Sequence, residues 1–188
     1  MQLSKIVLFS ILSVFMLTSL RAQTPLKEQK LIGKLSLELG LAGSGDMTLI
    51  NMENALEYKL NRYFTPSLSL ALARSDRGYY LTTSLIQTNA NIFFSPFGND
   101  GKNDFRIGAG ISGMRVSNFY QSGTQFVTTQ FVETIYTFEQ LSTYGFNVIL
   151  EDNFRVSEHI FVGLRMSYQL FENGDQIIGG GLNLGIGI

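Results

Sequence analysis

Six charged residues carry most of the chemistry that this sequence offers, and each lies where polar and apolar residues alternate. They are Glu38, Glu57, Lys59, Arg106, Glu151 and Arg165. Acids and bases number three each, and charges that are removed from water need partners. The structural interpretation is a set of salt bridges that plugs the interior of a barrel. The functional interpretation is a gated conduit or a small-ligand site.

Other motifs that suggest cofactor or metal binding are weak. Residues 108–113 match the pattern G-x-G-x-x-G, but a dinucleotide site needs this motif between a strand and a helix. Here the glycines lie within a strand pattern, where they make room in a crowded interior. Four carboxylates are expected in loops, without the spacing of a calcium-binding loop: Asp46, Glu53, Asp100 and Asp104. We therefore expect no metal and no cofactor.

The composition indicates a membrane protein that crosses the bilayer with strands. Hydrophobic residues make up 45% of the 188 residues and charged residues only 15%, whereas about 25% of a soluble domain is charged. The absence of cysteine excludes disulfides, thiol catalysis and cysteine-ligated metal. No apolar run after residue 22 is long enough for a spanning helix, and a closed β-barrel is the other structure that satisfies its backbone in lipid.

The first 22 residues have the pattern of a secretory signal peptide. Lys5 precedes a largely apolar stretch over residues 6–20, and Ala22 is the expected last residue removed. A retained membrane anchor is the alternative, although the apolar stretch is shorter than the roughly 20 residues that span a bilayer. Cleavage leaves 12 basic and 15 acidic residues, and without a basic run we expect no nucleic-acid partner. A short periplasmic segment then covers residues 23–33, and the barrel covers residues 34–188.

From residue 34 onward the sequence alternates with a period of two, which predicts β-strands. Eight segments show this pattern: residues 35–41, 56–60, 67–73, 79–95, 105–112, 146–151, 160–170 and 178–188. Turns are predicted at residues 61–66, 95–101, 155–159 and 172–175. Residues 117–140 form the longest predicted loop, although residues 125–138 are also able to extend the flanking strands as a hairpin. The sequence thus predicts an all-β fold, an eight-stranded antiparallel up-and-down transmembrane β-barrel.

The polar face distinguishes a membrane barrel from a soluble, lipocalin-like one. A soluble barrel exposes a face rich in Lys and Glu, whereas this face is mostly Gly, Ser, Asn and Ala. Small residues suit the narrow lumen of eight strands, and the opposite face of Leu, Ile, Val and Phe suits lipid. Aromatic residues near the strand ends suggest two interfacial belts. The periplasmic belt holds Tyr63, Phe64, Phe94, Phe97, Phe105 and Phe154, and the outer belt holds Tyr79, Tyr80, Tyr144, Tyr168 and Phe171.

The single histidine, His159, lies in a turn that is predicted on the periplasmic side. A hydrolytic triad needs a histidine beside a nucleophile and an acid. Lipid-modifying barrels place such residues towards the outer surface, which is the opposite end. We therefore interpret His159 as a turn residue and expect no enzymatic activity.

Three features resemble the outer membrane β-barrel domain family, which is common in Bacteroidetes and similar to OmpA, OmpX and OmpW-type barrels. They are the export signal that ends at Ala22-Gln23, the segment from Leu56 to Phe64, and the glycine-rich last strand. The resemblance implies a place in the outer membrane, contact with its lipid, and insertion by the barrel assembly machinery. Such barrels usually end in an aromatic residue that this machinery reads, whereas the last residue here is Ile188.

The sequence therefore predicts a non-enzymatic outer-membrane barrel, monomeric, that has a structural role or presents surface loops to a partner. Three alternatives stay open. They are porin-like transport of small or hydrophobic solutes, a lipid-modifying enzyme, and a soluble lipocalin-like binder.

Overall fold

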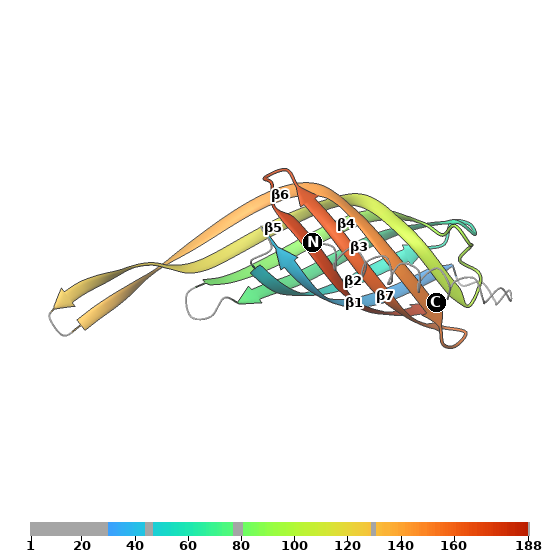
Figure 1. Ribbon diagram of the computed structural model, residues 1–188, viewed down its shortest axis with the longest axis horizontal. Coiled ribbons are helices and arrows are strands. Elements are labelled where there is room, and N and C mark those ends of the chain that lie inside the picture. The colour runs from blue at the N-terminus through green and yellow to red at the C-terminus, as the bar shows by residue number, and fades with distance from the viewer. Residues whose placement is uncertain (1–29, 44–46, 77–80, 129–130, 188) are drawn as a thin grey trace, which may run out of the picture.

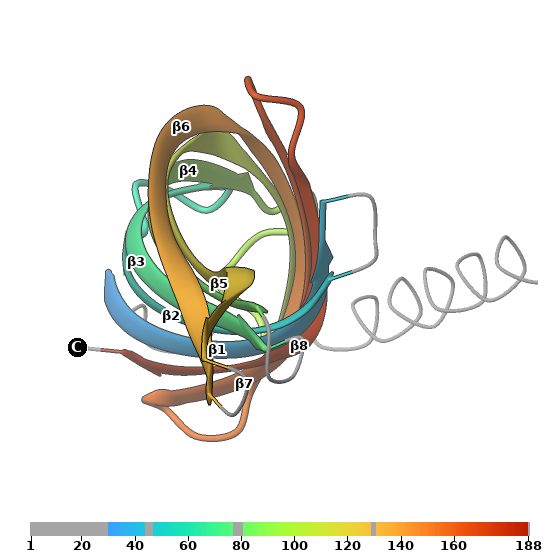
Figure 2. The ribbon, with the colours of Figure 1, turned by 90° about the vertical axis from the view of Figure 1, so that its left-hand side faces the viewer.

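The computed structural model describes residues 30–43, 47–76, 81–128 and 131–187. Eight antiparallel strands form a closed barrel in which each strand pairs with its neighbours in sequence and β1 pairs with β8 (Figures 1 and 2). The strands are β1 (Leu31–Ala42), β2 (Met47–Tyr58), β3 (Phe64–Asp76), β4 (Leu81–Phe94), β5 (Asn103–Thr128), β6 (Phe131–Arg155), β7 (Ile160–Phe171) and β8 (Gln176–Gly187). The predicted fold class is confirmed. Within these residues, no helix has the length and apolar character needed to cross a membrane.

The predicted signal peptide at residues 1–22, most of the predicted periplasmic segment at residues 23–33 and the terminal Ile188 lie outside the described residues. The first strand begins at Leu31, three residues before the expected start of the barrel. Leu31 and Gly187 lie at the same end of the barrel, because β1 begins beside the end of β8. We call this the terminal end, and the opposite end the hairpin end.

Alternation along the strands decides which side chains face the interior. In β1, Leu39 is 65% exposed on the outer surface, whereas Glu38 is 2% exposed inside. The same alternation continues in β7 and β8. Most polar residues therefore face inward and most leucines face outward, which is opposite to the arrangement in a lipocalin-like soluble barrel.

The turn between β2 and β3 is shorter than the predicted turn at residues 61–66. The side-chain oxygen of Asn61 accepts hydrogen bonds from the backbone N–H groups of Tyr63 and Phe64, at 2.8 and 2.9 Å, as in an Asx-turn. Pro66 lies within β3 and pairs with Ile92 of β4. The β2–β3 ladder ends one residue later, at Ser67, so the missing N–H of proline interrupts no pairing with β2.

Six of the residues assigned to the aromatic belts are exposed near the strand ends. At the terminal end Tyr63, Phe64, Phe94 and Phe154 are exposed, and near the hairpin end Tyr144 and Tyr168 are exposed. Phe105 and Phe171 are instead buried, and Phe97, which is half-buried, packs against Phe105 with ring centroids 6.4 Å apart. These three rings fill the barrel ends rather than facing lipid. Tyr79 and Tyr80 lie outside the described residues.

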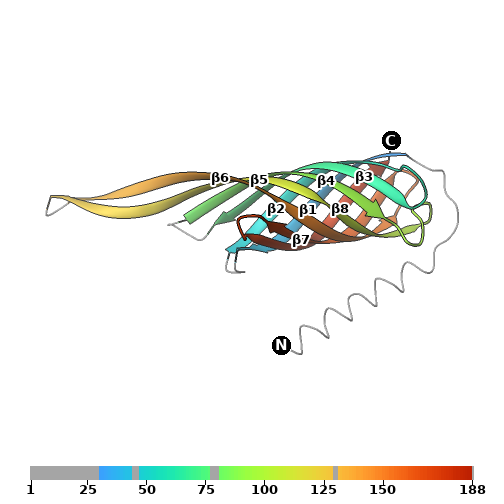
Figure 3. The same cartoon turned by 90° about the horizontal axis from the view of Figure 1, so that it is seen from above.

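Strands β5 and β6 continue far beyond the rest of the barrel (Figures 1 and 3). They contain 26 and 25 residues, and their pairing runs on to Thr128↔Phe131 through two bulges. Strand β4 accompanies β5 only as far as Tyr120, and β7 accompanies β6 only as far as Gly145. The prediction of a loop at residues 117–140 is therefore wrong, and its hairpin alternative is confirmed. The polar residues of this segment suggested a loop because they do not alternate with apolar ones. A two-stranded ribbon with water on both faces does not need that alternation.

Candidate functional site

The candidate site is the interior of the barrel, where the structure gathers the predicted charged residues. Glu38, Glu57, Lys59, Arg106, Glu151 and Arg165 are each at most 3% exposed. Two further charges, Lys34 and Glu53, are buried beside them. Lys34 has the same inward parity as Glu38 on β1, and Glu53 has the same parity as Glu57 on β2. Both residues would have been found if the predicted strands at residues 35–41 and 56–60 had been extended towards the N-terminus by one and two inward positions.

Four side chains form the first part of the network. Arg106 of β5 reaches Glu57 of β2 through Nη2 at 2.6 Å and Glu151 of β6 through Nε at 2.7 Å. Lys34 of β1 contacts the same two carboxylates through Nζ, at 2.6 and 2.7 Å. Within this part each carboxylate meets two cations, and each cation makes one contact with a neighbouring strand and one across the lumen.

Arg165 of β7 organises the second part. Its Nη1 and Nη2 lie 2.8 and 2.9 Å from the two carboxylate oxygens of Glu53, which is the paired geometry that suits a guanidinium. Its Nε lies 2.8 Å from Glu38, and Ser167 donates a hydrogen bond of 2.6 Å to the other oxygen of Glu38. A contact of 3.3 Å between Arg165 and Glu151 links the two parts.

The interior holds more charges than the three acids and three bases predicted, although acids and bases remain equal in number. Ten charged side chains are buried among the described residues, five acids and five bases. The acids are Glu38, Glu53, Glu57, Asp104 and Glu151, and the bases are Lys34, Lys59, Arg106, Arg155 and Arg165.

The prediction that Glu53 and Asp104 lie in loops is wrong, because both lie in strands, β2 and β5. Alternation breaks beside each of them, since Asn54 faces outward and Phe105 is buried. Asp100 lies at the surface, 3.4 Å from Arg62, as expected of a loop carboxylate. Asp46 lies outside the described residues.

Lys59 lies apart from these two groups of charges, where the loop between β4 and β5 closes the terminal end of the lumen. Its Nζ donates to the backbone carbonyl of Asn99 in the loop between β4 and β5. Asn99 in turn donates to the carbonyl of Asn61 and to Thr65, at 2.9 and 3.2 Å, and Asn99 is itself buried. This loop therefore folds against the β2–β3 turn and narrows the terminal end of the lumen.

Aromatic rings complete that closure. Phe161 lies beneath two cations, the guanidinium of Arg155 at 4.9 Å and the ammonium of Lys59 at 5.8 Å from its centroid. Phe93 lies beneath Arg106 at 4.1 Å. Gly108 makes this position possible, because a Cβ there would lie 2.5 Å from the ring of Phe93. The interpretation that the glycines of residues 108–113 make room in the lumen is confirmed at this position, and the motif lies within β5 rather than before a helix.

An apolar layer fills the lumen towards the hairpin end. Its buried members come from every strand except β6: Ala42, Leu49, Ala73, Leu85, Met114, Val116, Phe171 and Ile177. Between this layer and the charges, Gln87 donates a hydrogen bond of 3.0 Å to Gln169 across the lumen. The interior thus has three layers, and polar contacts cross the lumen in the middle one.

The single histidine is exposed rather than buried in the lumen. His159 lies in the turn between β6 and β7 at the terminal end, and its Nδ1 is 3.3 Å from the carbonyl oxygen of Gly187. Among the described residues, no three His, Asp or Glu side chains are grouped so that they would hold a metal ion.

No protein-family model matches the sequence, and no curated protein matches it. Solved structures match in fold. Neisserial surface protein A is 12% identical with a TM-score of 0.63, over 84% of this chain and 97% of that one. Ail, the attachment invasion locus protein of Yersinia pestis, is 10% identical with a TM-score of 0.57, over 85% and 99%. The outer membrane enzyme PagL is 13% identical with a TM-score of 0.51, over 82% and 99%.

The chain therefore has the fold of small eight-stranded outer-membrane barrels. A surface protein, an attachment invasion locus protein and an enzyme share this fold. At such low identity the likeness concerns the fold alone, so the role has to be argued from this chain's own residues.

Proposed function

We propose that the protein is an exported, non-enzymatic outer-membrane barrel whose plugged body anchors the β5–β6 hairpin and presents it to a protein partner outside the cell. The observation that carries this proposal is the length of the hairpin. Its two strands stay paired beyond the last partners that β4 and β7 provide.

The outer surface of the barrel supports a membrane location. Apolar side chains of Leu, Ile, Val and Phe are exposed on all eight strands or their ends. In water, this exposed apolar surface would cost about 25 cal/mol of free energy for each Å². Exposed aromatic rings at both ends suit the two membrane interfaces. Export rests on the signal-peptide pattern of residues 1–22, and membership of the Bacteroidetes-type family rests on the sequence resemblance.

The interior supports an anchor rather than a conduit. Lys34–Glu151, Arg106–Glu57 and Arg165–Glu53 each join strands that are separated around the barrel. A solute would have to break these contacts and leave charges unpaired in a narrow space, which is costly. The position of His159 at the terminal end supports the absence of enzymatic chemistry on outer-leaflet lipid.

The hairpin surface suits a protein partner. Phe119 and Tyr136 stack with centroids 5.0 Å apart and planes 10° apart, and Phe138 is exposed near them. The hydroxyl of Tyr120 donates a hydrogen bond of 2.7 Å to Glu139, which raises the pKa of the phenol and keeps it a donor. Aromatic residues are enriched in protein interfaces, and a two-stranded ribbon alone is only marginally stable in water.

Cysteine labelling tests this display, because the chain has no cysteine of its own. Tyr136→Cys places a thiol on the exposed hairpin, and Phe154→Cys places one at the exposed terminal end. A membrane-impermeant maleimide applied to intact cells should label the first and not the second, and lysis should expose both. Labelling of Phe154→Cys alone in intact cells would reverse the orientation and contradict the proposal.

A further inference from the structure

Apart from Gln176 at the hairpin end of β8, the outer wall formed by β8, β1, β2 and β3 carries one amide, that of Asn54, among mostly apolar side chains. On β2 the outward residues between Thr48 and Tyr58 are Ile50, Met52, Asn54 and Leu56. Asn54 pairs in register with Leu35 of β1 and Leu70 of β3, so its closest lateral neighbours are leucines. An amide on a membrane-facing surface is costly unless it finds a hydrogen-bond partner.

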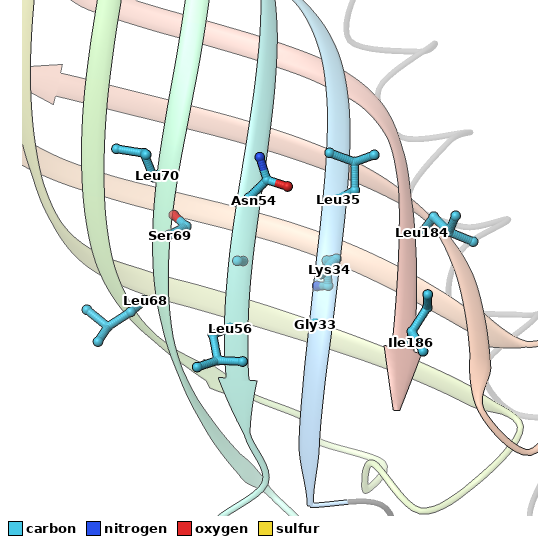
Figure 4. Close-up of a pocket in the computed structure, with 11 residues that line it drawn as sticks. Gly33, Lys34, Leu35, Asn54, Leu56, Leu68, Ser69, Leu70, Leu184 and Ile186 are labelled. Atoms are coloured by element: carbon cyan, nitrogen blue, oxygen red, sulfur yellow. The ribbon is translucent and has the colours of Figure 1, made fainter. Parts of the chain in front are cut away.

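Beside Asn54 the wall is hollowed (Figure 4). Gly33 occupies an outward position without a side chain, and a Cβ built there would meet nothing within 4 Å. The groove has a volume of about 770 Å³, and Leu35, Leu184 and Ile186 line one side of it. A second groove of about 550 Å³ lies on the far side of Leu56 and Leu68, which line both. The wall therefore presents a leucine ridge between two grooves.

The depth of Asn54 limits what can bind its amide. Asn54 lies four residues along β2 from Tyr58, which is exposed at the terminal end. At about 3.3 Å per residue and a tilt of about 40°, this places the amide roughly 10 Å inside the aromatic interface. Acyl chains at that depth have no hydrogen-bonding groups. A polar side chain of another membrane protein at the same depth does.

We propose that this wall binds a second copy of the protein in a parallel dimer, with Asn54 facing Asn54 of the partner subunit. Barrels inserted in the same direction are related by a two-fold axis along the membrane normal, so equivalent residues lie at equal depth. The amide is self-complementary, because it both donates and accepts. The ridge of one copy faces a groove of the other, and small residues such as Gly33 favour close approach in lipid. This inference rests on the proposed membrane location and departs from the expected monomer.

Disulfide cross-linking in outer membranes tests the dimer. Asn54→Cys should form a cross-linked dimer when a mild oxidant is added. Val148→Cys is the matched control, because Val148 is exposed on β6, on the opposite side of the barrel from β2. It should stay monomeric. Equal cross-linking of the two variants would indicate random collision and overturn the proposal. If Asn54→Cys stays monomeric, acyl chains occupy the groove, and this result would overturn the proposal as well.

The amide itself is tested without cysteine. Asn54→Leu should weaken dimerisation in bilayers roughly 3- to 15-fold, the range expected for one hydrogen bond within a membrane, when energy transfer between labelled copies is measured. Met52→Leu, one outward position away on β2, should leave dimerisation unchanged. An unchanged dimer in Asn54→Leu would overturn the proposal.

Heat-modifiable gel mobility and membrane fractionation of every variant separate the two proposals. A barrel that is inserted but monomeric refutes only the dimer. A protein that is absent from the outer membrane refutes both.

Discussion

Arg106 and Glu57 are joined across the lumen by a contact of 2.6 Å between Nη2 and Oε1, although β5 and β2 share no edge. Each side chain is 1% exposed. A buried ion pair contributes little net stability over an apolar pair, but removal of one partner leaves the other charge stranded. Removal of a single lumen charge is therefore the substitution that should change the stability of the barrel most.

Arg106→Ala should strongly destabilise the folded barrel. It leaves Glu57 and Glu151 each with Lys34 as the main remaining cation, and the expected loss in the free energy of unfolding is about 3–5 kcal/mol. Urea-induced unfolding in detergent micelles, followed by loss of the fast-migrating folded form on unheated gels, measures it. Arg62→Ala removes the exposed pair with Asp100 and should cost about 0–1 kcal/mol. Equal losses in the two variants would contradict the network.

The wild-type barrel should show no reproducible channels in planar bilayers, because the cross-lumen pairs fill its centre. Reproducible channels whose conductance changes in Arg106→Ala or Glu151→Ala would refute the plug and favour porin-like transport. Simultaneous replacement of Lys34, Arg106 and Glu151 by serine removes three long side chains from the middle layer. This variant should gain a small conductance if it folds, which heat-modifiable mobility reports.

Two adjacent glycines of β8 should differ sharply when each is replaced by alanine. In Gly181→Ala the new methyl would lie under 3.0 Å from backbone atoms of Leu37 and Glu38, so β1 must shift, at about 1–3 kcal/mol. In Gly180→Ala the nearest atom lies at 3.8 Å, and the free energy of unfolding should change by no more than about 0.5 kcal/mol. Similar values for both would contradict the close pairing of β8 with β1.

Phe119→Ala should loosen the hairpin and leave the barrel intact. The lost stack with Tyr136 is worth about 1 kcal/mol, which raises the opened population of the hairpin about fivefold. Limited proteolysis of the folded protein should therefore cut the hairpin faster, while the barrel keeps its heat-modifiable mobility. Loss of that mobility would show that the hairpin and the barrel unfold as one unit.

The alternating pattern was sufficient to predict eight strands and the direction of most side chains. Leu37 and Glu38 show why, since adjacent residues of a strand point to opposite faces. The prediction failed where the pattern itself is interrupted. Because the polar Asn54 faces outward, the sequence around Glu53 did not look like a strand. Because the apolar Phe105 is buried, the sequence around Asp104 did not look like the start of β5.

Period-two alternation and sparse charge are local properties that no partner strand alters, so the amino-acid sequence was enough to predict a closed barrel with a largely polar interior. Which of the charges meet depends on the folded barrel. Lys34 and Glu151 are 117 positions apart in the chain, and their contact depends on closure and register, which are set by the pairing of all eight strands together. The same pairing decided how far β5 and β6 extend beyond their neighbours, because that length depends on where β4 and β7 end.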